Sequence, residues 1–172
     1  FFDEGIVAHV PFGDPVCPIM AAAVHEAAVA TGAKVHRGGT YVCMEGPQFS
    51  TLAESKLYRS WGMDIIGMTN LQEAKLAREA EIAYATLALV TDYDCWHDAH
   101  DAVTIDMVVE YLNKNVRNAQ LVLKDAVKRL AAKETPNQYA DAIKNAIFTA
   151  PDHWPEATAK KLEAIIGKYR AK

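Results

Sequence analysis

The sequence predicts an α/β fold, and three features of the chain carry that prediction. Predicted strands and helices alternate through residues 40–92, as they do when helices connect strands of one sheet. Residues 82–90 (IAYATLALV) form a short aliphatic run without proline or glycine, which is typical of a buried strand. The last third of the chain has helical spacing instead. Because the predicted strands are few for a closed sheet, we expect part of the fold to lie outside this chain.

Composition indicates a single globular domain over residues 1–172. Hydrophobic residues make up 51% of the chain and charged residues 23%, which is enough to bury an ordinary core. The net charge of −4 and the lack of a Lys/Arg-rich run exclude a nucleic-acid partner, and no apolar run approaches the ~18 residues that a membrane span needs. Three cysteines without metal-type spacing favour reduced thiols and a cytoplasmic location.

Two kinds of element are predicted in the first part of the chain. Residues 4–10 predict a short strand. The alanine-rich stretch 18–31 predicts a helix, and Gly32 follows it where a left-handed C′ residue is favoured. Residues 34–36 and 40–44 predict two strands around a Gly-Gly turn.

A capping signal marks the next helix. Thr51 and Glu54 have the spacing of a capping box, so we expect a helix over residues 52–61, ended by Gly62. A short buried strand is predicted after it, over residues 64–68.

Four further helices are predicted towards the C-terminus. Asn70 with Glu73 is a second cap-like pair. Thr104 is expected to cap the longest helix, and Thr135 caps one that begins with a proline at its first helical position. The four predicted helices cover residues 70–81, 105–133, 136–147 and 156–169.

Three loops that follow predicted strands form the candidate site. They cover residues 45–51, 68–70 and 91–96. The carboxyl ends of parallel strands lie at one edge of a sheet, so these loops are expected to converge on one pocket. Their side chains suit a polar, uncharged ligand that carries an aromatic ring.

Two carboxylates, Asp92 and Asp94, stand at i and i+2 just past the predicted strand over residues 82–90. Extended backbone would place both on one side. Two like charges held close together raise the pKa of one of them, which favours a proton donor near neutrality. From this stretch alone, the pair is more typical of residues that cap a loop and the helix after it.

The other two loops offer aromatic and polar groups. Phe49 can stack on a ring, Ser50 can exchange one hydrogen bond, and the backbone N–H groups at Thr69 and Asn70 can hold an anion. Each has an alternative. Ser50 instead of Thr51 can cap the helix, and Phe49 can belong to the core.

Three other residues carry reactive side chains. His97 has the spacing of a helical ligand pair with His100, but no third ligand is evident, so no metal site is predicted. Cys95 has no paired base at a suitable spacing, which favours an inert thiol. His9 on its apolar segment is typical of a core histidine.

Three motifs together resemble the methylthioadenosine phosphorylases, a family within the purine nucleoside phosphorylase superfamily. They are Glu45-Gly46-Pro47-Gln48-Phe49-Ser50, Gly67-Met68-Thr69-Asn70 with Glu73, and Thr91-Asp92-Tyr93-Asp94-Cys95-Trp96. The similarity is continuous from residue 1 to about residue 130 and weakens afterwards.

This resemblance implies a fold and a reaction. The fold would be a mixed sheet, partly closed into a barrel and flanked by helices, whose amino-terminal part is missing from this chain. The reaction would be phosphorolysis of 5′-methylthioadenosine to adenine and 5-methylthioribose 1-phosphate, a step of purine and methionine salvage. Inorganic phosphate would be the co-substrate, and no cofactor or metal is implied.

The resemblance also implies roles for individual residues. Asp92 would donate a proton to N7 of the base, as catalysis requires when charge develops on a leaving group, and Asp94 would read the 6-amino group. The base site would be lined by Phe49 and Ser50. Met68 would lie against the ribose and Thr69 would bind phosphate.

Two further parts of the site are implied. An apolar pocket for the methylthio group would be formed by Ile105, Val108 and Val109. His9 would reach that group from a neighbouring subunit, which implies a homotrimer.

Ser50 and Asp92 favour adenine as the base. Related enzymes for 6-oxopurines carry glutamate and asparagine there, and a carboxylate suits the N–H donors of a 6-aminopurine. Gln48 and Gly67 depart from the family pattern, because many relatives have arginine and some have asparagine at these positions. Phosphorolysis of adenosine, inosine or methylthioinosine is the first alternative. The second is a non-catalytic fragment that needs its amino-terminal part, supplied as a separate piece.

The resemblance further implies that the 172 residues alone are inactive. The family's glycine-rich phosphate loop, an Arg-His pair and a phosphate-binding threonine have no counterpart in this sequence.

Overall fold

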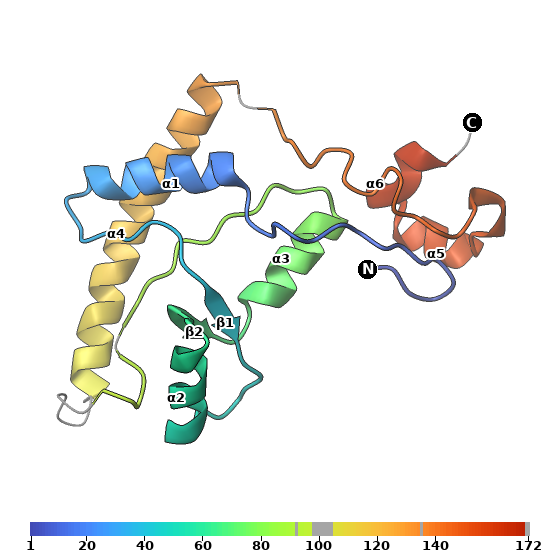
Figure 1. The fold of residues 1–172 in the computed structure, drawn as a ribbon. Helices are drawn as coiled ribbons and strands as arrows, with labels where there is room; N and C mark the ends of the chain where they lie inside the picture. The colour runs from blue at the N-terminus through green and yellow to red at the C-terminus, as the bar shows by residue number, and fades with distance from the viewer. Residues whose placement is uncertain (92, 98–104, 135, 171–172) are drawn as a thin grey trace. The chain divides into compact units, whose positions relative to one another are not determined.

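A computed structural model describes residues 1–91, 93–97, 105–134 and 136–170. Helices predominate among the described elements (Figure 1). In chain order the elements are α1 (Pro18–Ala30), β1 (Tyr41–Cys43), α2 (Leu52–Ser60), β2 (Ile65–Gly67), α3 (Asn70–Glu79), α4 (Ile105–Ala132), the 3₁₀ turn η1 (Pro151–His153), α5 (Glu156–Lys161), α6 (Glu163–Ile166) and the 3₁₀ turn η2 (Gly167–Tyr169). No described helix is both long and apolar enough to cross a bilayer.

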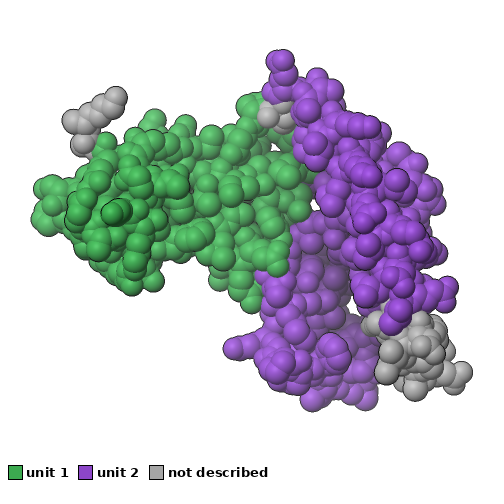
Figure 2. All heavy atoms as spheres, turned by 180° about the vertical axis from the view of Figure 1, so that it is seen from behind, with its two compact units in different colours: residues 1–20, 72–85, 135–172 green, residues 21–71, 86–134 purple. Residues whose placement is uncertain are grey.

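The chain divides into two compact units, each assembled from separate stretches of sequence (Figure 2). Unit 1 contains residues 1–20, 72–85 and 135–172, and unit 2 contains residues 21–71 and 86–134. The expectation of one domain over residues 1–172 stays a prediction.

The strands β1 and β2 form a parallel pair in unit 2. Tyr41 lies opposite Ile65, and Cys43 lies opposite Gly67. A parallel pair needs a crossover connection, which α2 supplies. This strand–helix–strand arrangement confirms the α/β prediction for residues 40–68, with the strands one residue shorter at each end than predicted.

The predicted strand over residues 82–90 is wrong. The segment has no regular secondary structure and no ladder partner among the described residues, and Ile82, Leu89 and Val90 are 56%, 40% and 61% exposed. An apolar run becomes a strand only when neighbouring strands accept its backbone hydrogen bonds, and β1 and β2 pair with each other.

Two more predicted strands are absent from the described structure. Residues 34–36 are irregular, and the segment 4–10 makes one isolated bridge, from Ala8 to Ile147. Neither run has a continuous strand partner among the described residues.

Unit 2 has a core of small side chains between α1 and α4. Ala27 and Ala28 of α1 are buried together with Val122 and Ala126 of α4. Small residues let the two helix backbones approach closely. At the helix end, Gly32 has φ of +75°, the left-handed conformation that was predicted for it.

Local signals also fix the ends of α2 and α3. Thr51 caps α2 through a complete capping box with Glu54, as predicted. Asn70 is the first residue of α3, and its side-chain oxygen accepts a hydrogen bond from the Thr86 hydroxyl.

Unit 1 is held by a separate core that joins distant parts of the chain. It is built from Ile6, Ile143, Trp154, Ala159, Leu162 and Ile166. The predicted helix over residues 136–147 is wrong, since this stretch forms successive tight turns that bury Ile143. The predicted helix over residues 156–169 is interrupted at Leu162, whose ψ of 6° departs from helical geometry.

A buried carboxylate connects these turns to the end of α3. Glu81 is 8% exposed and has φ of +58°. Its side chain accepts hydrogen bonds from the Ile143 N–H (3.0 Å) and the Tyr169 hydroxyl (2.6 Å), and it pairs with Lys168 at 2.5 Å. Burial, followed by the hydrogen bond to Glu81, raises the pKa of Tyr169 to about 12.

Candidate functional site

The loops after β1 and β2 leave the sheet at the same edge. The strands are parallel and end opposite each other at Cys43 and Gly67. One more backbone bond continues the pairing into the loops, because the Met44 N–H donates to the Gly67 carbonyl at 2.8 Å. The first two predicted loops therefore start side by side in unit 2.

The third loop is connected to the first by a cysteine. The Cys95 thiol donates to the Ser50 carbonyl at 3.6 Å, and the Cys95 N–H donates to Oδ1 of Asp94 at 2.8 Å. These contacts tie Asp94 to Ser50. We call residues 44–51, 67–70 and 93–97 the three-loop cluster.

Ser50 is not the helix cap. Thr51 occupies that position, with its side chain accepting from the Glu54 N–H. The half-buried Ser50 directs its hydroxyl to the sulfur of Met44, at 3.3 Å. Sequence reasoning missed Met44, and a methionine at a strand end carries no signal that would have identified it.

Phe49 lies on the surface. Its 85% exposure shows that the core alternative is wrong, and it leaves the ring accessible to a ligand. Thr69 is also exposed, whereas Met68 and Asp94 are half-buried.

Two glycines shape the cluster. A Cβ at Gly46 would lie 2.8 Å from the Met68 sulfur, so glycine allows Met68 to lie against the first loop. A Cβ at Gly67 would lie 1.7 Å from the Tyr41 hydroxyl oxygen. Tyr41 thus occupies the space of a side chain at position 67, which explains why this sequence has glycine there.

The end of the third loop packs through aromatic contacts. The Arg59 guanidinium of α2 lies 3.3 Å from the centre of the Trp96 ring, a close cation–π contact. His97 stacks on Tyr93 with ring centres 4.5 Å apart, and its predicted partner His100 lies outside the described residues. Among the residues that the structure describes, no group of three or more His, Cys, Asp or Glu side chains is placed to hold a metal ion.

For several predicted site residues the structure gives no position relative to the cluster. Asp92 and the side chains of Ile105 and Val108 lie outside what the structure describes, and Val109 is 48% exposed on α4. His9 belongs to unit 1, where it is exposed and its ring meets Phe148 edge-on at 6.3 Å. The core alternative for His9 is therefore wrong.

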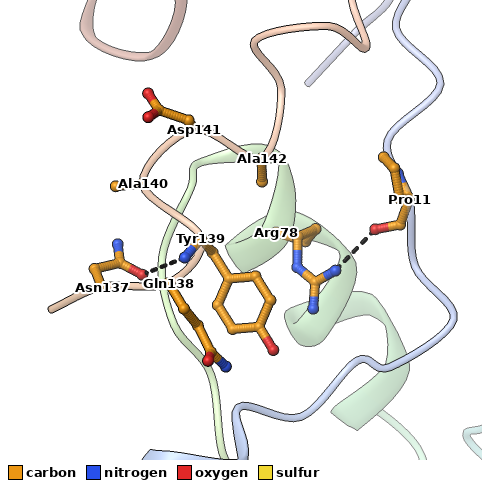
Figure 3. A pocket seen from close by; sticks show the side chains of 8 residues that line it. All are labelled: Pro11, Arg78, Asn137, Gln138, Tyr139, Ala140, Asp141 and Ala142. Carbon is orange, nitrogen blue, oxygen red and sulfur yellow. Dashed lines mark hydrogen bonds between the residues drawn. The ribbon is translucent and has the colours of Figure 1, made fainter.

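Unit 1 contains a shallow pocket of about 290 Å³ beside Arg78 (Figure 3). Arg78 is 7% exposed and donates to the carbonyls of Pro11 (2.8 Å) and Asp14 (2.6 Å). Its guanidinium also lies 4.0 Å from the Tyr139 ring centre. Because these contacts use the guanidinium to hold the backbone at Pro11 and Asp14, we assign Arg78 a structural role.

Comparison with known proteins finds relatives along almost the whole chain. A family model described as the phosphorylase superfamily matches residues 1–128. The S-methyl-5′-thioadenosine phosphorylase of Gloeobacter violaceus is 57% identical over 99% of this chain and 58% of its own length. That of Koribacter versatilis is 60% identical over 98% of this chain and 58% of its own length. The chain thus spans about 58% of the length of these curated relatives.

Solved structures extend the similarity to the fold. A methylthioadenosine phosphorylase from an Antarctic soil metagenomic library superposes with a TM-score of 0.89 at 47% identity, covering 95% of this chain and 58% of that one. The methylthioadenosine phosphorylase of Schistosoma mansoni, in complex with adenine, gives 0.73 at 30% identity, covering 83% and 57%. The resemblance inferred from the three motifs is confirmed, and the chain belongs to the phosphorylase superfamily, with its α/β fold.

Proposed function

We propose that the protein carrying these residues catalyses phosphorolysis of 5′-methylthioadenosine to adenine and 5-methylthioribose 1-phosphate. The observation that carries the proposal is the three-loop cluster, in which two loops leave the β1–β2 pair at one edge and Cys95, next to Asp94, contacts the Ser50 carbonyl. Relatives at 57–60% identity bear the name of this activity.

The base side of the reaction requires a proton donor, an acceptor for the 6-amino group and a stacking surface. Asp92 protonates N7 as charge develops on the leaving adenine. Asp94 accepts the 6-amino N–H through Oδ2, since Oδ1 already accepts from the Cys95 N–H and Oδ2 has no donor among the described residues. The exposed ring of Phe49 stacks on the purine.

The sugar and phosphate side uses groups around the start of α3. Met68 contacts the ribose, and Thr69 binds phosphate next to the backbone N–H groups that open this helix at Asn70. Ile105, Val108 and Val109 form the methylthio pocket. His9 completes it from a neighbouring subunit of a homotrimer.

The remainder of the catalytic fold comes from outside the 172 residues. In this proposal an amino-terminal part completes the mixed, partly closed sheet and supplies most of the phosphate donors. The segment 82–90, with its exposed apolar residues, then gains strand partners. No metal or organic cofactor takes part, and the protein is cytoplasmic.

Adenosine is the second candidate substrate. One structural relative, 31% identical, is described as an adenosine/methylthioadenosine phosphorylase. The two substrates differ only at the 5′ position, so the base-side residues do not distinguish them. A non-catalytic fragment is the other alternative, which the 58% span keeps open.

The test is adenine release from 5′-methylthioadenosine, with and without phosphate, by the natural polypeptide that carries these residues. We expect release only with phosphate, and a faster reaction than with inosine. Release without phosphate would indicate a hydrolase. No release under any condition would overturn the proposed function.

A further inference from the structure

We propose that Met44 determines base specificity by positioning the Ser50 hydroxyl, an inference that rests on the proposed function. The Ser50 Oγ lies 3.3 Å from the Met44 Sδ, within hydrogen-bonding distance for sulfur. A thioether has lone pairs but no hydrogen to give. The hydroxyl must therefore be the donor, and its one proton is directed at the sulfur.

The consequence is that Ser50 presents only acceptor lone pairs to a ligand. A hydroxyl has one proton and two lone pairs, and no described side chain or backbone N–H donates to this oxygen. A 6-aminopurine brings N–H donors, which match these lone pairs. A 6-oxopurine brings a carbonyl oxygen to the same place, and Ser50 would have to break its bond to Met44 in order to donate to it.

Both partners of this bond are held in place by the backbone. Met44 is fixed by its N–H, which donates to the Gly67 carbonyl at 2.8 Å beside the strand pair. Ser50 is fixed by its carbonyl, which accepts from the Cys95 thiol at 3.6 Å. Thr51 takes over the helix cap, so the Ser50 hydroxyl is not diverted to α2.

The test compares 5′-methylthioadenosine with 5′-methylthioinosine in the natural polypeptide. Met44→Leu keeps the apolar volume and removes the acceptor, which frees the Ser50 hydroxyl to donate. We expect the ratio of kcat/KM for the amino over the oxo substrate to fall about three- to tenfold, the size of one ordinary hydrogen bond. The change should come mainly through KM. A purely structural effect would lower kcat/KM for both substrates by the same factor and leave the ratio unchanged.

Four companion variants separate this role from others. Met44→Ile repeats the test with a second apolar side chain in case Met44→Leu folds poorly. Met44→Gln retains an acceptor for the Ser50 hydroxyl, so its ratio of kcat/KM should stay close to that of the wild type. In a Ser50→Ala background, Met44→Leu should change nothing further, because the hydroxyl is gone. Met63→Leu makes the same chemical change outside the cluster and should behave like the wild type.

Two results are decisive against the inference. An unchanged ratio in both apolar variants, or an equal effect of Met44→Leu with and without Ser50, overturns it while phosphate-dependent release still supports the proposed function. If the wild type neither releases a base nor binds adenine in a direct titration, the proposed function and this inference both fall.

Discussion

Phe49 shows how exposure separates a binding role from a structural one. The side chain is 85% exposed, so Phe49→Ala should leave the free energy of unfolding within about 0.5 kcal/mol of the wild type. It should raise KM for 5′-methylthioadenosine about two- to tenfold, since aromatic stacking contributes roughly 0.5–1.5 kcal/mol. Phe49→Tyr keeps the ring and serves as the control. Unfolding curves and steady-state kinetics on one preparation check both expectations, and a large loss of stability would contradict the surface assignment.

The residue types at the site were readable from the sequence, but their contacts were not. Asp94, Phe49 and Ser50 stand in recognisable motifs, and parallel-strand geometry brings two of the three loops to one edge. Met44 carries no such signal, because its role depends on a sulfur atom reaching a hydroxyl six residues away. The sequence alone also allows either Ser50 or Thr51 as the helix cap, and the structure assigns the cap to Thr51 through its capping box with Glu54.

The start of α2 predicts two substitutions with opposite effects. Thr51→Ala removes the cap and should destabilise unit 2 by about 0.5–2 kcal/mol. Thr51→Ser keeps a capping hydroxyl and should retain most of the wild-type stability. Ser55, one turn later, is 1% exposed, and its hydroxyl has no hydrogen-bond partner among the residues that the structure describes. Ser55→Ala should therefore be neutral or stabilising, since it removes an unsatisfied buried group. Chemical denaturation of both variants checks this pair, and equal destabilisation by both would contradict the capping assignment.

The same capping box makes α2 sensitive to acid. The backbone N–H and then the hydroxyl of Thr51 hold the pKa of Glu54 below its ordinary value of 4.5. A lowered carboxyl pKa stabilises the fold above pH 4.5, and this contribution is lost as the pH falls through the lowered value. Glu54→Gln should lack that part of the pH dependence. The denaturation midpoints of the wild type and the variant, measured from pH 7 to pH 3, should converge as the pH falls. A difference between the midpoints that does not change with pH would contradict the prediction.

The Glu81 cluster predicts the opposite sensitivity for unit 1. The pKa of Tyr169 is raised from 10.0 to about 12, so its hydrogen bond to Glu81 stabilises the fold below pH 10 and is lost as the pH rises from 10 to 12. Tyr169→Phe should destabilise the protein by about 1–3 kcal/mol near neutrality, and the difference should shrink above pH 10. Tyr139→Phe removes a phenol oxygen elsewhere in the unit and is the control. A pH-independent difference would show that the hydroxyl has another role.

Elements with local signals were predicted well, and elements that depend on distant partners were not. The ends of α1 and α2 follow from Gly32 and from the Thr51 cap, which act within one turn. The segment 82–90 needs strand neighbours, and the turns around Ile143 depend on Glu81, 62 residues earlier in the chain. Sequence periodicity contains no information about such partners. This is why residues 136–147, although flanked by a proline start signal, form turns.

The division into two interleaved units bears on what the 172 residues can do alone. Each unit has its own buried cluster, Ile6 with Ile143 in unit 1 and Ala27 with Val122 in unit 2. Each can therefore keep local structure without a complete active site. The predicted groups for the base lie in unit 2, and Thr69 is the one phosphate ligand that the motifs predict in this stretch. Folding and catalysis are thus expected to be separable.

The 172-residue polypeptide by itself should fold but neither bind phosphate nor release adenine. An anion needs several convergent donors, and most of these lie outside the 172 residues in the proposed enzyme. A ligand present at a concentration of a hundred times its Kd stabilises the folded state that binds it by about 2.7 kcal/mol. We therefore expect no shift in the thermal midpoint of these 172 residues with 10 mM phosphate, and a clear shift for a polypeptide that also carries the remaining part of the curated relatives' length. Adding that part as a separate chain should restore phosphate-dependent adenine release. Phosphate protection of the 172 residues alone would contradict the assignment of most phosphate donors to the other part.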